Sequence, residues 1–149
     1  MIVERIKRRM TRRRAVGIVL GTAVLILGLL GLRLLLARTD AGTQEGRIAF
    51  LDNLGWKADP ASEEHRSCLL PEEPDAAMAD YIRMQQAQGY DLSRHLGECC
   101  EIYSYRLTNN PDSGQTVLAT LYVQGRRIIA GDIHSTALDG FMHGLKAPH

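Results

Sequence analysis

The chain has 149 residues, with 18 Lys or Arg, 17 Asp or Glu and three Cys, and its formal net charge of +1 hides a strong asymmetry. Residues 1–38 hold nine basic residues and one acidic residue, whereas residues 39–149 hold nine basic and sixteen acidic residues, for net charges of +8 and −7. The acidic part is long enough for one modest hydrophobic core, and its charge argues against a nucleic-acid partner.

The first predicted element is a transmembrane helix. Residues 1–14 carry seven Lys or Arg, and an uncharged apolar run follows from Ala15 to Leu32. Eighteen residues rising about 1.5 Å each span about 27 Å, close to the roughly 30 Å of a bilayer's hydrocarbon core. Because the side chain of Arg33 can snorkel to the headgroups, we extend the helix over residues 15–37. Basic residues stay on the cytoplasmic side, so we expect a cell-membrane protein with a cytoplasmic N-terminus and an extracytoplasmic C-terminal domain.

A cleaved signal peptide is the alternative interpretation of the same residues. The apolar part of a signal peptide usually has about 7–15 residues and ends at a small-x-small cleavage site. Here the run is longer, Leu35-Leu36-Ala37 places leucine where a small residue is required, and Thr39-Asp40-Ala41 is a weak site. We therefore favour a helix that stays in the lipid bilayer. Its Gly17-x-x-x-Gly21 pattern is typical of packed membrane helices, which leaves self-association as an open prediction.

Residues 38–44 read as a polar linker, and residues 45–149 as one extracytoplasmic domain. The domain begins with a helical pattern that ends at Gly55, a residue that commonly terminates helices. A second helix is predicted between Asp75, which can cap its N-terminus, and Gly89, with one extra turn over residues 92–96.

The remaining pattern has a period of two, which is typical of strands. Turn residues separate the last three of the four predicted strands, so they form an antiparallel meander. Because the strands are grouped instead of alternating with helices, the fold class is α+β, with two helices packed on one face of the sheet. The predicted strands cover residues 65–70, 99–108, 116–123 and 126–134.

The three cysteines, Cys68, Cys99 and Cys100, all lie in the domain that we expect outside the membrane, where disulfides form. Adjacent cysteines on a strand point to opposite faces, so a Cys99–Cys100 disulfide would need a strained turn. A disulfide from Cys68 to either of the other two is easier, and a buried reduced thiol is an equal alternative.

Asp132 and His134 are the candidate metal ligands, because side chains two residues apart on a strand share a face. Asp139 and His143 follow within one loop or short helix and would complete a carboxylate–imidazole cluster able to bind a divalent ion or transfer protons. The default interpretation is a solvated strand face, because no helical metal-binding or catalytic motif supports the site. We expect no catalytic residue and no cofactor.

Several short motifs recur in an order that resembles the bacterial domain of unknown function 4830 family, over residues 45–145. The resemblance implies a small membrane-tethered extracytoplasmic domain of Gram-positive bacteria, and it implies no activity. The motifs are Phe50-Leu51-x-x-Leu54-Gly55-Trp56, Leu70-Pro71, Gln85-x-x-Gln88-Gly89-Tyr90-Asp91-Leu92, Tyr103-x-Tyr105 and Gly131-Asp132-Ile133.

The expected function is therefore non-enzymatic: a protein-interaction or accessory domain at the cell envelope, with an envelope or membrane protein as partner. Two alternatives remain open. The first is a sensor of a small ligand or divalent metal that uses Asp132 and His134. The second is an envelope hydrolase, for which the sequence offers no recognisable nucleophile.

Overall fold

The computed structural model describes residues 23–28, 40–110 and 114–146, and the chain divides into two units, Met1–Ala37 and Arg38–His149. In the first unit the described residues 23–28 are helical, with exposed apolar side chains. The rest of the predicted 15–37 helix and the basic segment 1–14 lie outside the described residues. Within those that are described, none of the helices has the length and apolarity to cross a bilayer.

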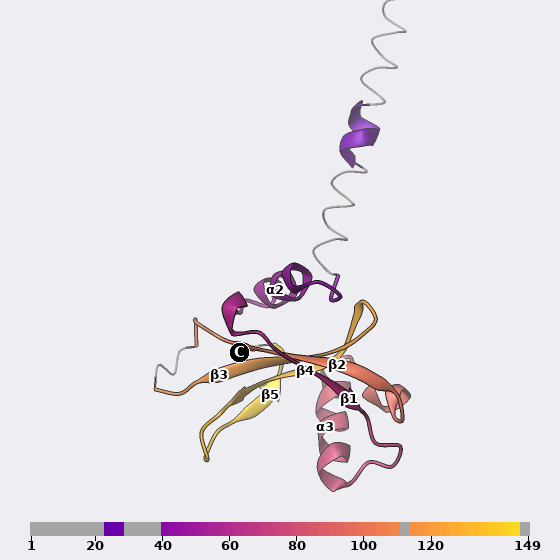
Figure 1. Ribbon diagram of the computed structural model, residues 1–149, viewed down its shortest axis with the longest axis vertical. Coiled ribbons are helices and arrows are strands. Elements are labelled where there is room, and N and C mark those ends of the chain that lie inside the picture. Colours follow the sequence, from indigo (N-terminus) through magenta and orange to yellow (C-terminus); the bar gives the residue numbers. More distant parts are fainter. Residues whose placement is uncertain (1–22, 29–39, 111–113, 147–149) are drawn as a thin grey trace, which may run out of the picture. The chain divides into compact units, whose positions relative to one another are not determined.

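The second unit is an α+β domain, as predicted, and its described residues form one antiparallel sheet and two α-helices. Figure 1 shows its elements in chain order, coloured from indigo to yellow. They are α2 (Gln44–Asn53), η1 (Pro60–Ser62), β1 (Glu64–Leu69), α3 (Ala76–Ala87), η2 (Leu92–His95), β2 (Cys99–Arg106), β3 (Val117–Gln124), β4 (Arg127–Ser135) and β5 (Met142–Gly144).

The sheet is a meander with the strand order β1-β2-β3-β4-β5, and every neighbouring pair is antiparallel. The predicted meander and the predicted first strand are both confirmed. The short edge strand β5 was not predicted. We had expected a loop or short helix there, because a three-residue strand that contains Gly144 has too few residues to show a period of two.

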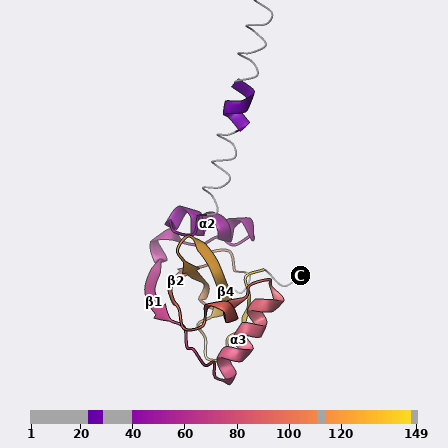
Figure 2. The same cartoon turned by 90° about the vertical axis from the view of Figure 1, so that its right-hand side faces the viewer.

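The two α-helices lie on opposite faces of the sheet (Figures 1 and 2), so the prediction that they share one face is wrong. Leu51 of α2 packs with Ala119 and Leu121 of β3 in one core cluster. Ile82 of α3 packs in a second cluster, against which Tyr122 of β3 lies. Successive side chains of a strand point to opposite faces, so β3 contributes to both clusters and is buried on both sides.

Local signals explain where each helix begins and ends. The Thr43 side chain accepts a hydrogen bond from the Gly46 amide at the start of α2, and the Asp75 side chain accepts one from the Met78 amide at the start of α3. Side-chain oxygens at these positions satisfy amides that have no partner within the helix. Gly89 has φ = +95° just after α3, a conformation that glycine adopts without steric cost. The predicted cap at Asp75 is confirmed.

Candidate functional site

Asp132 and His134 lie on β4 and point toward the α3 side of the sheet, as their two-residue spacing predicts. The Nδ1 atom of His134 is 2.7 Å from Oδ1 of Asp132. On its other oxygen, Oδ2, Asp132 accepts a hydrogen bond of 2.7 Å from the Tyr81 hydroxyl of α3. One carboxylate therefore joins a helix and a strand residue in a Tyr81–Asp132–His134 chain.

The solvated-face interpretation is wrong for Asp132, which is only 2 % exposed. A buried carboxylate needs hydrogen-bond donors to replace water, and the two donors present here are the Tyr81 hydroxyl and the His134 imidazole. His134 itself is partly exposed at the rim of this site. The signal that sequence reasoning missed is Tyr81, which the helical spacing of α3 indicates only as a core residue.

The pKa values of His134 and Tyr81 are shifted by burial and by the neighbouring Asp132. The hydrogen bond and the negative charge of Asp132 raise the pKa of His134 above its ordinary value, because they favour the protonated imidazolium. Burial, with the nearby Asp132 charge, raises the pKa of the Tyr81 hydroxyl, so Tyr81 stays neutral and donates. The site is thus arranged to hold an imidazolium–carboxylate ion pair at the surface end of a buried polar chain.

The structure does not bring the predicted cluster together. Asp139 is exposed in the turn between β4 and β5. His143 points to the opposite sheet face from His134, where its ring stacks on Phe141 with a centroid distance of 5.3 Å. Among the described residues, no group of three or more His, Cys, Asp or Glu is placed to hold a metal ion. Of the four predicted metal ligands, only Asp132 and His134 therefore lie together in the described part of the chain.

A His–Asp pair also orients a general base in hydrolases, where the free imidazole nitrogen accepts a proton from a nucleophile. The Nε2 atom of His134 has no hydrogen bond to a serine, threonine or cysteine of the described residues. The Thr120 hydroxyl, on the cross-strand partner of Asp132, is hydrogen-bonded to the Ser104 hydroxyl with an oxygen–oxygen distance of 2.9 Å. The described geometry therefore provides an oriented imidazole without an attached nucleophile.

Two glutamines, Gln85 of α3 and Gln88 at its C-cap, hold the helix against Gly131 of β4. Gln85 is fully buried, donates to the Gly131 carbonyl oxygen and accepts from the Gly131 amide, both at 3.0 Å. Gln88 donates to the same carbonyl oxygen and accepts from the Leu145 amide. These contacts join two motifs that lie more than 40 residues apart, and their i, i+3 spacing on one helix face was the available signal.

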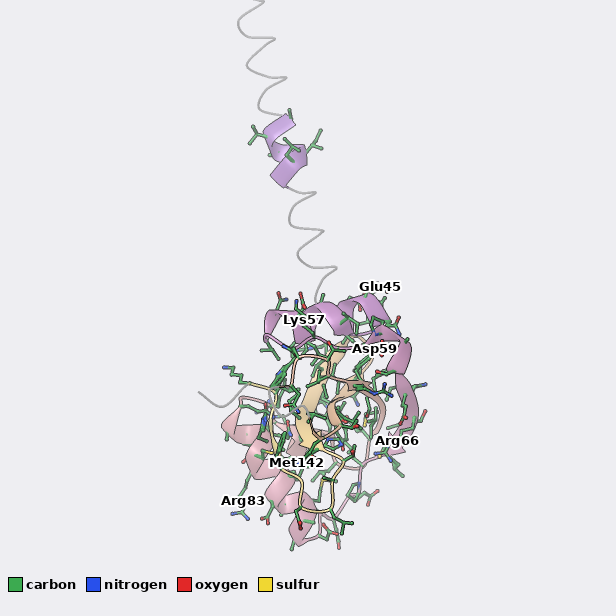
Figure 3. All side chains as sticks on the ribbon, turned by 90° about the vertical axis from the view of Figure 1, so that its left-hand side faces the viewer. Glu45, Lys57, Asp59, Arg66, Arg83 and Met142 are labelled. Atoms are coloured by element: carbon green, nitrogen blue, oxygen red, sulfur yellow. The ribbon has the colours of Figure 1, made fainter. Side chains whose placement is uncertain are left out.

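Three exposed apolar side chains, Leu138, Phe141 and Met142, lie on the β4–β5 hairpin, and we call them the β4–β5 hairpin surface. Met142 is on the sheet face of His134, whereas Phe141 stacks on His143 on the opposite face. All three side chains are exposed, Leu138 completely so. Met142 is the cross-strand partner of His134, and Figure 3 labels it among the surface side chains. In the ranges 40–110 and 114–146, the other large apolar side chain that is exposed is Leu69 on β1.

The turn that carries this surface is held by hydrogen bonds. The Ser135 hydroxyl donates to the Gln115 side chain at 2.6 Å and accepts from the Ala137 amide at 3.1 Å. The Ser135 amide donates to the Phe141 carbonyl oxygen at 2.9 Å, which closes the turn. Leu138 is therefore presented to solvent on an anchored turn.

The cysteines are placed by the register of β1 and β2. Cys68 and Cys100 are directly opposite each other on the same face, whereas Cys99 points to the other face and is exposed. All three are free thiols in the structure. Burial raises the pKa of the Cys100 thiol to about 11.

Comparison of the chain with protein-family models, with curated proteins and with solved structures gave no match. The resemblance to the domain of unknown function 4830 family therefore stays a prediction, and the function is argued from the chain's own residues.

Proposed function

We propose that this chain is a single-pass membrane protein whose extracytoplasmic domain is a non-enzymatic protein-interaction module, and that the β4–β5 hairpin surface is its contact with an envelope or membrane protein. The observation that carries the proposal is the concentration of exposed apolar side chains on this one hairpin. Exposed apolar groups that cluster on an otherwise polar surface mark sites of protein contact.

The membrane anchor in this proposal rests on the sequence. The apolar run has the length of a bilayer crossing, and seven basic residues precede it on the side that stays in the cytoplasm. The side chains of Val24, Leu25, Ile26 and Leu27, in the described helical segment, are apolar and exposed, which suits contact with lipid. Membership of the domain of unknown function 4830 family is part of the same proposal.

His134 adds a polar element to the proposed contact. Its imidazole lies beside Met142 in the sheet register and is held in orientation by Asp132, and its raised pKa favours a positive charge. Interfaces commonly combine an apolar centre with a few oriented polar groups at the rim, and those groups contribute specificity. The hairpin and the His–Asp pair together therefore have the composition of a small recognition surface.

The test is in-cell crosslinking of the tagged, full-length protein, followed by mass spectrometry of the captured proteins. We expect Leu138→Lys to abolish capture of a partner that the wild type captures reproducibly. Leu69→Lys is the matched control, because Leu69 is also largely exposed (66 %) but lies on β1, outside the hairpin. It should leave capture unchanged.

The proposal is refuted if Leu138→Lys captures the same proteins as the wild type while both variants reach the membrane and stay folded. Capture of the chain alone would identify self-association instead. A rise of the melting temperature in millimolar Ca²⁺, Zn²⁺ or Mn²⁺ would favour the metal-sensor alternative, because a ligand that binds the native state stabilises it.

A further inference from the structure

Cys68 and Cys100 are cross-strand partners in the antiparallel pair of β1 and β2. Both side chains point to the α3 side of the sheet, where Cys100 belongs to the second core cluster and Cys68 packs against that cluster. Cys99 is next to Cys100 in sequence, but its side chain points to the opposite face and its cross-strand partner is Leu69. The structure therefore distinguishes the two candidate partners of Cys68, which the sequence alone left open.

We infer that Cys68 and Cys100 form an intramolecular disulfide when the domain meets a small-molecule disulfide, and that Cys99 is left as the exposed thiol. This inference concerns the chemistry of the domain itself and stands independently of the hairpin surface and its partner.

The backbone geometry brings the two residues within reach of each other. The Leu70 amide donates to the Glu98 carbonyl oxygen, so these two residues form a hydrogen-bonded cross-strand pair. Such pairs recur every second residue, so Cys68 and Cys100 form the next one. Hydrogen-bonded cross-strand pairs have Cα atoms about 5.5 Å apart, inside the range of about 4.4–6.8 Å that disulfides span.

The Cβ atoms of such pairs are up to about 5.5 Å apart, wider than the roughly 3.5–4.5 Å of a disulfide, so closing the disulfide requires a local twist of β1 that tilts the two Cα–Cβ bonds toward each other. Among the described strands, none pairs with the other side of β1. The movement therefore breaks no second ladder of hydrogen bonds.

The reaction is two successive thiol–disulfide exchanges. The Cys68 thiolate, on the more accessible of the two side chains, attacks one sulfur of the external disulfide and expels one thiolate, which leaves a mixed disulfide on Cys68. The Cys100 thiolate then attacks the Cys68 sulfur and expels the second thiolate. The two protein thiols are oxidised, the external disulfide is reduced to two thiols, and these thiols take up the two protons released by the cysteines.

The buried position of Cys100 determines which step is slow. Because its pKa is raised to about 11, little Cys100 thiolate is present at neutral pH. We therefore expect the mixed disulfide on Cys68 to accumulate first and the cross-link to form faster as the pH rises.

The cross-link would enclose the segment that carries α3 and η2, because both elements lie between the two cysteines in the chain. That segment contributes Tyr81, Gln85 and Gln88, which hold α3 to β4. A disulfide that closes a loop of roughly 30 residues limits the freedom of the unfolded chain. The oxidised protein should accordingly melt at least about 5 °C above the reduced one.

The experiment uses the full chain in detergent micelles, reduced first and then incubated with oxidised glutathione at pH 8. Trypsin cleavage and mass spectrometry without reduction should show the peptides of residues 67–83 and 95–106 joined. Cys99→Ser is the decisive variant, because it leaves only Cys68 and Cys100. It should form the cross-link as a monomer, with a mass lower by two hydrogen atoms.

The control variants remove one of the two proposed partners. Cys100→Ala keeps Cys68 and Cys99 and should give only glutathione adducts, because those side chains point to opposite faces. Cys68→Ala, at the edge strand, should also lose the cross-link, and the emission of Trp56 reports whether each variant is folded. The inference is overturned if folded Cys99→Ser gives only glutathione adducts, or if Cys100→Ala forms the cross-link and Cys99→Ser does not.

Discussion

Replacing Tyr81 by phenylalanine tests whether the buried Tyr81–Asp132–His134 chain stabilises the domain. The change removes only the hydroxyl that donates to Asp132 Oδ2 at 2.7 Å and keeps the ring, which packs against the second core cluster and lies 5.7 Å from the Tyr122 ring. Asp132 is 2 % exposed, so water cannot readily replace the lost donor.

A hydrogen bond to a charged group contributes about 1.5–3 kcal/mol, and leaving one partner buried without its donor costs an amount in the same range. We therefore expect Tyr81→Phe to lower the free energy of unfolding by about 1.5–3 kcal/mol. With a urea m-value near 1.5 kcal/mol/M, the unfolding midpoint should fall by about 1–2 M.

The assay is urea unfolding of the full-length protein in detergent, followed by the fluorescence of Trp56. This residue is the only tryptophan of the chain and is buried in the domain, so its emission follows the domain and not the predicted anchor. The matched control is Tyr90→Phe. Burial raises the pKa of Tyr90, as it does for Tyr81, but the Tyr90 hydroxyl has no hydrogen-bond partner among the described residues. If the two variants lose the same stability within about 0.5 kcal/mol, the hydroxyl–carboxylate bond does not contribute and our reasoning fails.

Three further predictions address charge and packing. The raised pKa of His134 contributes stability that is fully present below the ordinary histidine pKa of about 6.5 and is lost as the pH rises through the raised pKa. In urea titrations, the wild type should therefore lose stability between about pH 6 and pH 8, and His134→Gln should reduce this loss. The Arg47 side chain is 3 % exposed and donates hydrogen bonds to the Tyr105 hydroxyl and the Glu63 carboxylate. Arg47→Met should therefore lower the free energy of unfolding by about 3–5 kcal/mol in the same assay, whereas Arg83→Met, at an exposed arginine, should change it little. A Cβ at Gly46 would lie 1.8 Å from the Asp40 carbonyl oxygen, so Gly46→Ala should lower the melting temperature strongly, whereas Gly114→Ala, with no atom within 4 Å, should not.

The candidate site shows what pattern reasoning can and cannot predict. The two-residue spacing of Asp132 and His134 correctly placed both on one strand face. The prediction that this face is solvated was wrong for Asp132, because its burial depends on α3, whose Tyr81 precedes it by 51 residues. A period of two states that two side chains share a face, but it does not state what covers that face.

The cysteines give a second example. From the sequence, Cys99 and Cys100 were equal candidates to pair with Cys68. The register of β1 against β2 separates them, and a shift by one residue would exchange their roles. That register depends on the summed packing of both strands and on the connection through α3, which no local pattern contains.

The sequence by itself determined the elements that depend on neighbouring residues: the N-terminal cap of α3, the glycine that follows this helix, the alternation of the central strands and the α+β class. The tertiary structure alone decided that α2 and α3 cover opposite faces, that Asp132 is buried between Tyr81 and His134, and that Cys68 lies opposite Cys100. The physical reason is the sequence separation over which the interactions act. Capping and periodicity are interactions within a few residues, whereas the choice of face and register minimises exposed apolar surface over the whole domain.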